Sequence, residues 1–394
     1  MNYAIVSGDS HVDMSMLPGD LFVDNAPAHL KGQVPHIEDT DEGPRWVAEG
    51  RILGVVQSAG FEFIPAQRGR WKRTDRMLDA GFYDGRGHPT DPELRLKDII
   101  MDGVDAEVIY GITGTGKNLI DRETIAAVYR IYNDWVNEFC GKSPGRWYAL
   151  ACIPIHDPRL AASELMRAAR LDYIRGADLM AAEVSRPIYS RDGYWNPLWK
   201  ALAETELPLS FHIGGAPISV PPPPDDGSTE IIISDRQPTQ NELAYRGVTD
   251  SLGQLSGAQW LSGILLSGAC ELFPNFRFVM GEAGAAWIPF VLGRLDHTYL
   301  ESSLDKEFDP PLTMLPSEYW FRQGATTFQE EPVDGQMASI IGEDNLMWGS
   351  DYPHPDGVWP DSKKVIKETM GQLEPTVLRK IIRDNAVKLY RIGQ

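Results

Sequence analysis

The sequence has few cysteines, and none of them is spaced as a pair. Cys140, Cys152 and Cys270 are the only three in 394 residues, and all stand in apolar surroundings. A disulfide-stabilised secreted domain needs an even set of cysteines, and a thiol redox motif needs a CxxC pair. The sequence therefore predicts buried free thiols in a reducing compartment.

Long apolar runs and an excess of positive charge are also missing. No run approaches the roughly 20 residues that cross a bilayer, and the first apolar stretch begins at Tyr3 without the pattern of a signal peptide. The 37 Lys and Arg residues are outnumbered by 56 Asp and Glu, which gives a formal net charge of −19. This charge disfavours nucleic acids and anionic membranes as partners. We therefore expect a cytoplasmic protein that acts on a small molecule, and a homodimer is compatible with this composition.

The sequence does contain a regular alternation of short apolar runs with helical segments. The runs have the length of strands, and most are followed by a helical pattern. No internal repeat or linker divides the chain. This order predicts one α/β domain over residues 1–394, a single (β/α)8 TIM barrel. The expected strands are 3–11, 106–110, 147–154, 176–180, 207–212, 276–282, 321–328 and 345–351.

Two connections are much longer than a barrel needs. Residues 13–92 form an irregular stretch rich in Pro, Gly and Trp, with a weak strand candidate at 52–56, and residues 214–242 contain a proline-rich excursion. Connections this long are usually lids or binding loops. Both follow strand ends at the face where barrel enzymes place their chemistry, so we expect them to cover a shared pocket.

The first of these insertions contains a basic island in an otherwise acidic protein. Arg68, Arg70 and Arg73 surround Trp71. Guanidinium groups bind carboxylates and phosphates with two parallel hydrogen bonds. We predict that these four residues bind an anionic part of the substrate; the alternative is a solvated surface.

Polar side chains end five of the predicted strands. Residues two apart in a strand share a face, so Asp9 and His11 project together. Taken singly, such residues are common in turns and cores. Because the carboxyl ends of barrel strands converge, their recurrence favours one shared site for a divalent metal. The candidate ligands are Asp9, His11, Asp178, His212, Glu282 and Asp351.

The same positions carry a resemblance to a known family. The sequence resembles the amidohydrolase superfamily, especially the amidohydrolase-2 branch that includes aminocarboxymuconate-semialdehyde decarboxylase. The resemblance covers essentially the whole chain, and the run from Gly349 to His354 is its most specific part. The motifs are Gly8-Asp9-Ser10-His11-Val12, Met101-Asp102-Gly103-Val104-Asp105, Phe211-His212, Gly281-Glu282-Ala283-Gly284 and Gly349-Ser350-Asp351-Tyr352-Pro353-His354.

Three positions depart from the family pattern. The family usually has His-x-His on the first strand, a carboxylated lysine on the fourth in its dinuclear members and a histidine on the sixth. Asp9, Asp178 and Glu282 stand there instead. With Asp351 they bring four negative charges, which two divalent ions would neutralise. We therefore expect two ions, with oxygen-rich ligation that suits iron or manganese at least as well as zinc. One ion would be held by Asp9, His11 and Asp351 and the other by His212 and Glu282, with Asp178 bridging; the alternative is one ion.

These features lead to two hypotheses about the reaction. The first is a metal-dependent hydrolase of an amide, ester or thioester, in which Asp351 takes the proton from a metal-activated water and His354 orients Asp351 or contacts substrate. The departures of the sequence from the family pattern resemble a di-iron thioesterase branch. The basic island would suit the phosphorylated carrier arm of a thioester substrate. The alternative is a mononuclear decarboxylase or hydratase of a carboxylated small molecule, with Glu282 as the acid–base group.

Overall fold

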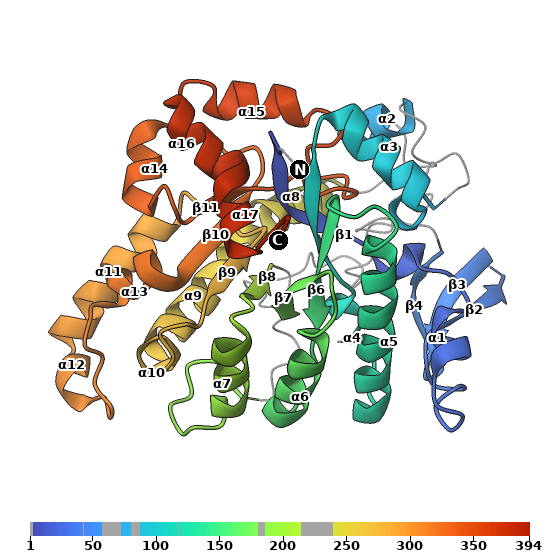
Figure 1. Cartoon of the computed structure of the whole chain (residues 1–394), viewed down its shortest axis with the longest axis horizontal. Coiled ribbons are helices and arrows are strands. Elements are labelled where there is room, and N and C mark those ends of the chain that lie inside the picture. Colours follow the sequence, from blue (N-terminus) through green and yellow to red (C-terminus); the bar gives the residue numbers. More distant parts are fainter. Residues whose placement is uncertain are drawn as a thin grey trace.

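Eight parallel strands form the central sheet of the protein (Figure 1). The computed structural model describes residues 3–41, 43–56, 72–79, 87–116, 118–179, 186–213 and 239–394. Each strand pairs with the next one along the chain, and the connections between successive strands are mostly helical, as the sequence predicts. The strands are β1 (Val6–His11), β5 (Ala106–Tyr110), β6 (Trp147–Cys152), β7 (Ile174–Leu179), β8 (Leu209–His212), β9 (Phe278–Gly281), β10 (Gly324–Phe328) and β11 (Leu346–Trp348).

The first strand and the segment after the last strand close the sheet into a barrel. Ser10 and Tyr352 form a parallel bridge. The backbone N–H of Asp351 donates to the oxygen of Asp9 at 3.0 Å, and the N–H of His11 donates to the oxygen of Tyr352 at 2.6 Å. We call these bonds the seam of the barrel. The seam is made by the same short segments that carry four of the predicted site residues.

Helices cover the outside of the barrel, and Figure 1 shows α5, α6 and α7 side by side beyond the strands. Their ends follow local sequence signals. In α3, Asp91 accepts hydrogen bonds from the N–H groups of Glu93 and Leu94, and Gly103 ends the helix at φ 82°. The helices between and after the barrel strands are α3 (Pro92–Asp102), α4 (Thr113–Gly116), α5 (Arg122–Cys140), α6 (Pro158–Ala168), α7 (Asn196–Thr205), α8 (Gln240–Gly253), α9 (Gly257–Leu266), α10 (Ala269–Leu272), α11 (Ile288–Glu301), α12 (Leu304–Glu307), α13 (Pro316–Gln323), α14 (Gly335–Ile341), α15 (Ser362–Met370), α16 (Pro375–Arg379) and α17 (Asn385–Leu389).

Two apolar layers hold the barrel and its helices together. One lies between the strands and the outer helices and includes the buried residues Ile109, Phe211 and Trp348. The other is built on inward-facing strand residues and on Tyr390 and Ile392 beyond α17. All three cysteines are buried free thiols, as predicted. No described helix combines the length and apolar character that a bilayer span requires.

The structure corrects two parts of the predicted layout. The stretch after His11 is not wholly irregular, because β2 (His36–Thr40), β3 (Gly43–Ala48) and β4 (Arg51–Val55) form an antiparallel sheet. The helices α1 (Leu21–Asn25) and α2 (Lys72–Asp79) belong to the same insertion. In addition, residues 321–323 end α13 and are not part of a strand. Residues 214–238 lie outside the described part, so the paired lids stay a prediction.

Candidate metal centre

The end of β1 brings an aspartate and a histidine together. Asp9 and His11 are both buried, and Oδ1 of Asp9 lies 3.3 Å from Nε2 of His11. The other carboxylate oxygen of Asp9, Oδ2, accepts a hydrogen bond from Oγ1 of Thr327 at 2.7 Å. Because Oδ2 has this partner, Oδ1 is the oxygen that faces the imidazole.

The end of β8 contributes a second imidazole to the same place. Nδ1 of His212 lies 3.1 Å from the backbone oxygen of Ile213. A carbonyl only accepts, so Nδ1 carries a proton, and in the neutral ring Nε2 keeps the lone pair. Nε2 of His212 lies 3.2 Å from Nε2 of His11. Histidine ligands of metals are oriented in this way by a hydrogen bond from their other nitrogen.

Glu282 and Asp351 follow their strands in an uncommon backbone conformation. Their φ angles are 51° and 55°, in the left-handed region that residues with a side chain seldom adopt. Such conformations persist where surrounding contacts hold them, and they are frequent at functional sites. For Glu282, the N–H donates to Oγ1 of Thr327 at 2.6 Å. Asp351 is held by the seam bond to Asp9.

The turned backbone aims both carboxylates at the histidines. Oε2 of Glu282 lies 3.4 Å from Nε2 of His212. Oδ1 of Asp351 lies 3.1 Å from Nε2 of His11. Gly349 makes this approach of chain segments possible, since a Cβ at that position would lie 2.5 Å from the Cβ of Asp9.

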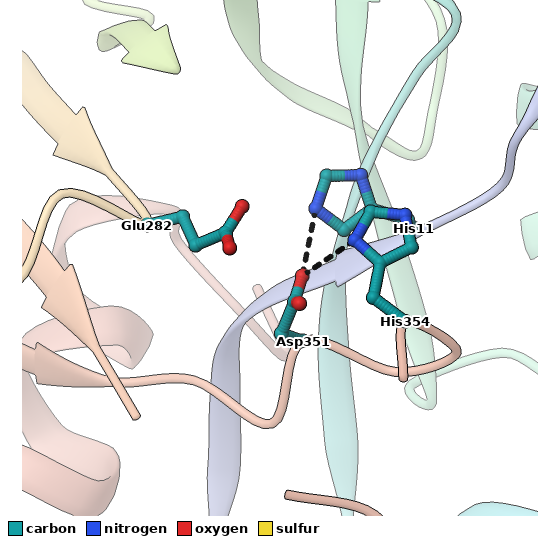
Figure 2. Close-up of side chains that lie close together, drawn as sticks. All are labelled: His11, Glu282, Asp351 and His354. Carbon is teal, nitrogen blue, oxygen red and sulfur yellow. Dashed lines mark ion pairs between the residues drawn. The ribbon is translucent and has the colours of Figure 1, made fainter. Parts of the chain in front are cut away.

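His354 lies beside His11 and faces the same oxygen of Asp351, as Figure 2 shows. Its Nδ1 is 3.1 Å from Oδ1 of Asp351, and its Nε2 is 3.2 Å from Oδ2 of Asp13. Its ring stacks on His11 with centroids 4.1 Å apart. Asp351 thus contacts both rings, while Glu282 approaches from a different direction.

The carboxylates favour positive charge at this centre. Burial and the charge of His354 lower the pKa of His11, but close contacts with Asp351 and Asp9 outweigh them and raise it to about 9. Burial also lowers the pKa of His354, whereas the charges of Asp351 and Asp13 raise it well above its usual value. Burial raises the pKa of Asp351, but His354 and His11 hold it below its ordinary range. The arrangement therefore calls for a cation, which a proton or a metal ion can supply.

Asp178 occupies a different environment. Its Oδ2 accepts a hydrogen bond from Oγ1 of Thr113 at 2.6 Å, and its Oδ1 is buried without a hydrogen bond to any described residue. Burial raises the pKa of Asp178. It also raises the pKa of Glu282, and the charge of Asp351 adds to that rise. Both shifts favour the neutral forms of these carboxyl groups and so reduce the negative charge that a cation must balance.

The spacings between His11 and its neighbours fit a divalent ion bound beside Nε2 of His11. Around Nε2 of His11, atoms of Asp9, Asp351 and His212 lie at 3.3, 3.1 and 3.2 Å. Ligand atoms about 2.1 Å from one ion are roughly 3 Å apart when they lie at right angles. Within the described residues, Oδ1 of Asp9 and both oxygens of Asp351 are buried and lack a hydrogen bond apart from the ion-pair contacts with His11 and His354. Buried carboxylate oxygens in this state need a cation.

The geometry also argues against the predicted pair of ions. Two groups of the described residues could ligate a metal, one made of Asp9, His11 and His212 and the other of His11, Glu282, Asp351 and His354. His11 belongs to both groups, and its Nε2 has a single lone pair, which can bind one ion. Asp178 belongs to neither group, so it does not bridge them.

The predicted basic island lies mostly outside the described residues. Arg68, Arg70 and Trp71 fall there, and of Arg73 the structure describes only its place in α2. Arg76 is described, and it forms an ion pair with Asp361 at the start of α15. The assignment of Arg68, Arg70, Trp71 and Arg73 to substrate therefore stays a prediction.

Three residues at the site were missed from the sequence. Asp13 continues the alternation of Asp9 and His11, and this spacing could have identified it. Thr327 lies near the end of a predicted strand, but a threonine there is also an ordinary strand residue. Thr113 lies in a glycine-rich stretch that gives no sign of its bond to Asp178.

Comparison with known proteins identifies the family of the chain. The amidohydrolase family matches residues 83–392. The chain belongs to this family. A gamma-resorcylate decarboxylase of Rhodococcus jostii (strain RHA1) is 23% identical over 317 residues, covering 77% of this chain and 88% of that protein. The family membership confirms the resemblance seen in the motifs and makes the protein an enzyme of the amidohydrolase superfamily.

Solved structures share the barrel. The structure of 5-carboxyvanillate decarboxylase from Sphingomonas paucimobilis matches with a TM-score of 0.65 and 20% identity, covering 100% of each chain. A variant of this decarboxylase from Novosphingobium aromaticivorans was solved with bound manganese and 3-methoxy-4-hydroxy-5-nitrobenzoic acid. It matches with a TM-score of 0.66 and 18% identity, covering 99% of this chain and 97% of that one.

These comparisons correct the leading functional hypothesis. The named relatives of this amidohydrolase are decarboxylases, so the prediction of an amide, ester or thioester hydrolase is wrong. The resemblance to di-iron thioesterases is wrong for the same reason. The two-ion site belonged to that hypothesis, and the shared nitrogen of His11 speaks against it as well.

Proposed function

We propose that this amidohydrolase is a decarboxylase of an aromatic carboxylate and that it uses one divalent metal ion. The proposal is carried by the contacts that Asp9, His212 and Asp351 each make with Nε2 of His11 at the carboxyl ends of the strands. It is supported by the similarity to decarboxylases of aromatic acids.

Asp9, His11, His212 and Asp351 would hold the ion. Two imidazoles with carboxylates suit manganese, which is the metal named in the Novosphingobium structure. When bound, the ion would attract the substrate carboxylate and stabilise negative charge as it develops on the substrate. The proton-transfer role predicted for Asp351 belongs to the hydrolase hypothesis and is not kept.

The chain itself must then supply a proton. Decarboxylation breaks the bond between the ring carbon and the carboxylate; carbon dioxide leaves, and the ring carbon keeps the electron pair and takes a proton. We assign the donation to Glu282, whose Oε2 lies 3.4 Å from Nε2 of His212. Figure 2 shows its carboxyl group on a different side of Asp351 from His354. Burial and the charge of Asp351 raise the pKa of Glu282, which favours the protonated form that a general acid needs.

His354 would have a supporting role in the reaction. Its contacts with Asp351 and Asp13 hold the ring and favour the imidazolium form. In that form His354 supports the orientation of Asp351. It also offers positive charge to a substrate carboxylate in a site that is otherwise acidic.

Metal analysis and a direct assay test the proposal together. Protein loaded with manganese and freed of excess metal should contain about one ion per chain. It should convert at least one member of a panel of hydroxylated aromatic carboxylates, including 2,6-dihydroxybenzoate and 5-carboxyvanillate, to carbon dioxide and the decarboxylated ring. Esters and thioesters of the same acids are the control. Hydrolysis of the control compounds without release of carbon dioxide from the panel would contradict the proposal.

A further inference from the structure

Thr327 lies beneath the proposed metal ligands and connects two of the functional groups. It is fully buried on β10. Its Oγ1 accepts a hydrogen bond from the N–H of Glu282 at 2.6 Å and lies 2.7 Å from Oδ2 of Asp9. An N–H can only donate and a carboxylate can only accept, so the single hydroxyl proton goes to Asp9.

The side chain of Thr327 on β10 contacts Asp9 on β1 across the strand that separates them. In the sheet order, β11 lies between β10 and β1. Gly349, just after β11, has no side chain that would displace Asp9 from this path. The methyl group of Thr327 lies over Gly8, where a Cβ would be 3.3 Å from Cγ2. The methyl contact and the two hydrogen bonds together leave one orientation for the side chain.

We propose that Thr327 is a positioning residue that sets the metal affinity of the centre through Asp9. This inference rests on the proposed function. The hydrogen bond to Oδ2 holds the carboxylate so that Oδ1 faces Nε2 of His11 at 3.3 Å. Without the hydroxyl, Asp9 can rotate away from the ion, and the N–H of Glu282 is left buried without its partner.

The expected size of the effect follows from other metal proteins. Residues that orient a ligand through a hydrogen bond typically contribute 10–100-fold to metal affinity. The bond from Thr327 is assisted by the charge of the carboxylate, which makes it one of the stronger kinds. We therefore expect the manganese dissociation constant to rise by roughly 10–100-fold when the hydroxyl alone is removed.

The test compares substitutions at Thr327 and at its neighbour. Thr327→Val keeps the shape and removes the hydroxyl, and Thr327→Ser keeps the hydroxyl. Thr326→Val is the matched control, because Thr326 is equally buried and its hydroxyl bonds to the backbone oxygens of Met280 and Gly284. Manganese binding to each metal-free protein is measured by calorimetric titration, and the electron paramagnetic resonance spectrum of the bound ion reports its surroundings.

Thr327→Val should bind manganese 10–100-fold more weakly with an altered spectrum, while Thr327→Ser and Thr326→Val stay within about threefold of the parent protein. Thr327→Val binding as tightly as the parent, with the same spectrum, would overturn the inference and leave the proposed function standing. A parent protein that binds no manganese would overturn both. If Thr327→Val does not fold, Thr327→Ser and Thr327→Ala isolate the hydroxyl in the same way, and equal affinities of these two would again overturn the inference.

Discussion

One ring atom, Nε2 of His11, contacts each of the other proposed metal ligands. The ring is also stacked against His354 and lies near Tyr110, with centroids 4.1 and 5.5 Å away. A side chain enclosed on so many sides has little freedom to change its rotamer. The centre is therefore organised around a histidine that is held before any ion arrives.

The acid role proposed for Glu282 gives the sharpest test at a single residue. Glu282→Gln keeps the shape and the backbone bond to Thr327 but cannot supply the same proton. We expect kcat to fall by about 10²–10⁴ with about one ion still bound. Elemental analysis and a carbon dioxide assay on the same preparation measure both quantities. Unchanged turnover with the ion in place would remove Glu282 from the reaction.

His212 and His354 should behave differently when each is shortened. His212→Ala removes a proposed ligand, so metal content and activity should be lost together. His354→Ala leaves the proposed ligands in place, so most of the metal should remain, while KM for the carboxylate rises because a positive charge is lost. Metal analysis with steady-state kinetics separates the two variants. Loss of metal from His354→Ala but not from His212→Ala would show that the second candidate group holds the ion.

The sequence identified the site residues. It did not reveal their protonation states or that His11 belongs to both candidate ligand groups. Asp9, His11, His212, Glu282 and Asp351 stand out because each ends a strand of a predicted barrel. Whether Glu282 carries a charge depends on burial and on the nearness of Asp351, which are properties of the folded chain. The error in the number of ions came from counting formal charges without these contacts.

At the scale of elements, α3 connects the barrel seam with the last part of the chain. Arg95 of α3 is buried, pairs with Glu107 at 3.0 Å and donates to the backbone oxygen of His11 at 2.8 Å. At the other end of the helix, Asp102 accepts hydrogen bonds from the N–H and the hydroxyl of Ser362, the first residue of α15. Asp102 therefore caps a helix far away in the sequence.

This buried cap should make stability depend on pH. Burial raises the pKa of Asp102 from 3.8 to about 6, although the bonds from Ser362 oppose the rise. Between about pH 6 and pH 4 the folded protein binds a proton that the unfolded chain does not yet bind, so acidification favours the folded state. A rise of this size corresponds to about 3 kcal/mol.

Asp102→Asn removes this titration and keeps an oxygen that can accept from Ser362. The stability of the parent protein relative to Asp102→Asn should therefore increase as the pH falls from 7 to 4, by up to about 3 kcal/mol. Thermal unfolding of both proteins at several pH values measures the difference, in which the other titrating groups cancel. A difference that stays constant with pH would contradict a raised pKa at Asp102.

Elements were easiest to predict where the apolar pattern was simple. The strands predicted at 106–110 and 147–154 correspond to β5 and to β6, which ends two residues earlier than predicted. In the small sheet, β4 confirms the weak strand candidate at 52–56, whereas β2 was missed because it is largely exposed and lacks an apolar face that sequence patterns can reveal. The aromatic residues at 319–321 favour a strand locally, but they pack as the end of α13.

At the scale of the whole molecule, the proposed ion would cross-link distant parts of the barrel. The four ligands come from β1, from β8 and from the segment after β11. An ion that binds only the folded protein stabilises it by mass action, by about 2.7 kcal/mol at one hundred times the dissociation constant. The melting temperature should rise by a few degrees with manganese and fall again after chelation. His212→Ala should show neither change, and a shift of equal size in that variant would indicate binding elsewhere.

The barrel itself could be predicted because eight apolar runs recur in order, with a helical pattern after most of them. The reaction could not be predicted, since the same set of side chains was compatible with both hypotheses, a hydrolase and a decarboxylase. The choice between the two reactions depended on Asp9, Asp178 and Glu282, which differ from the family pattern. The roles of these residues are set by their neighbours in space.

The seam of the barrel determines when the proposed metal site can form during synthesis of the chain. A ribosome makes Asp9 and His11 about 340 residues before Asp351, and at about 5–20 residues per second these events are separated by tens of seconds. Throughout that interval β1 has no partner on its closing edge, and the bonds from His11 to Tyr352 and from Asp351 to Asp9 cannot form. The ion that we propose therefore meets its full set of ligands only after Asp351 has been made.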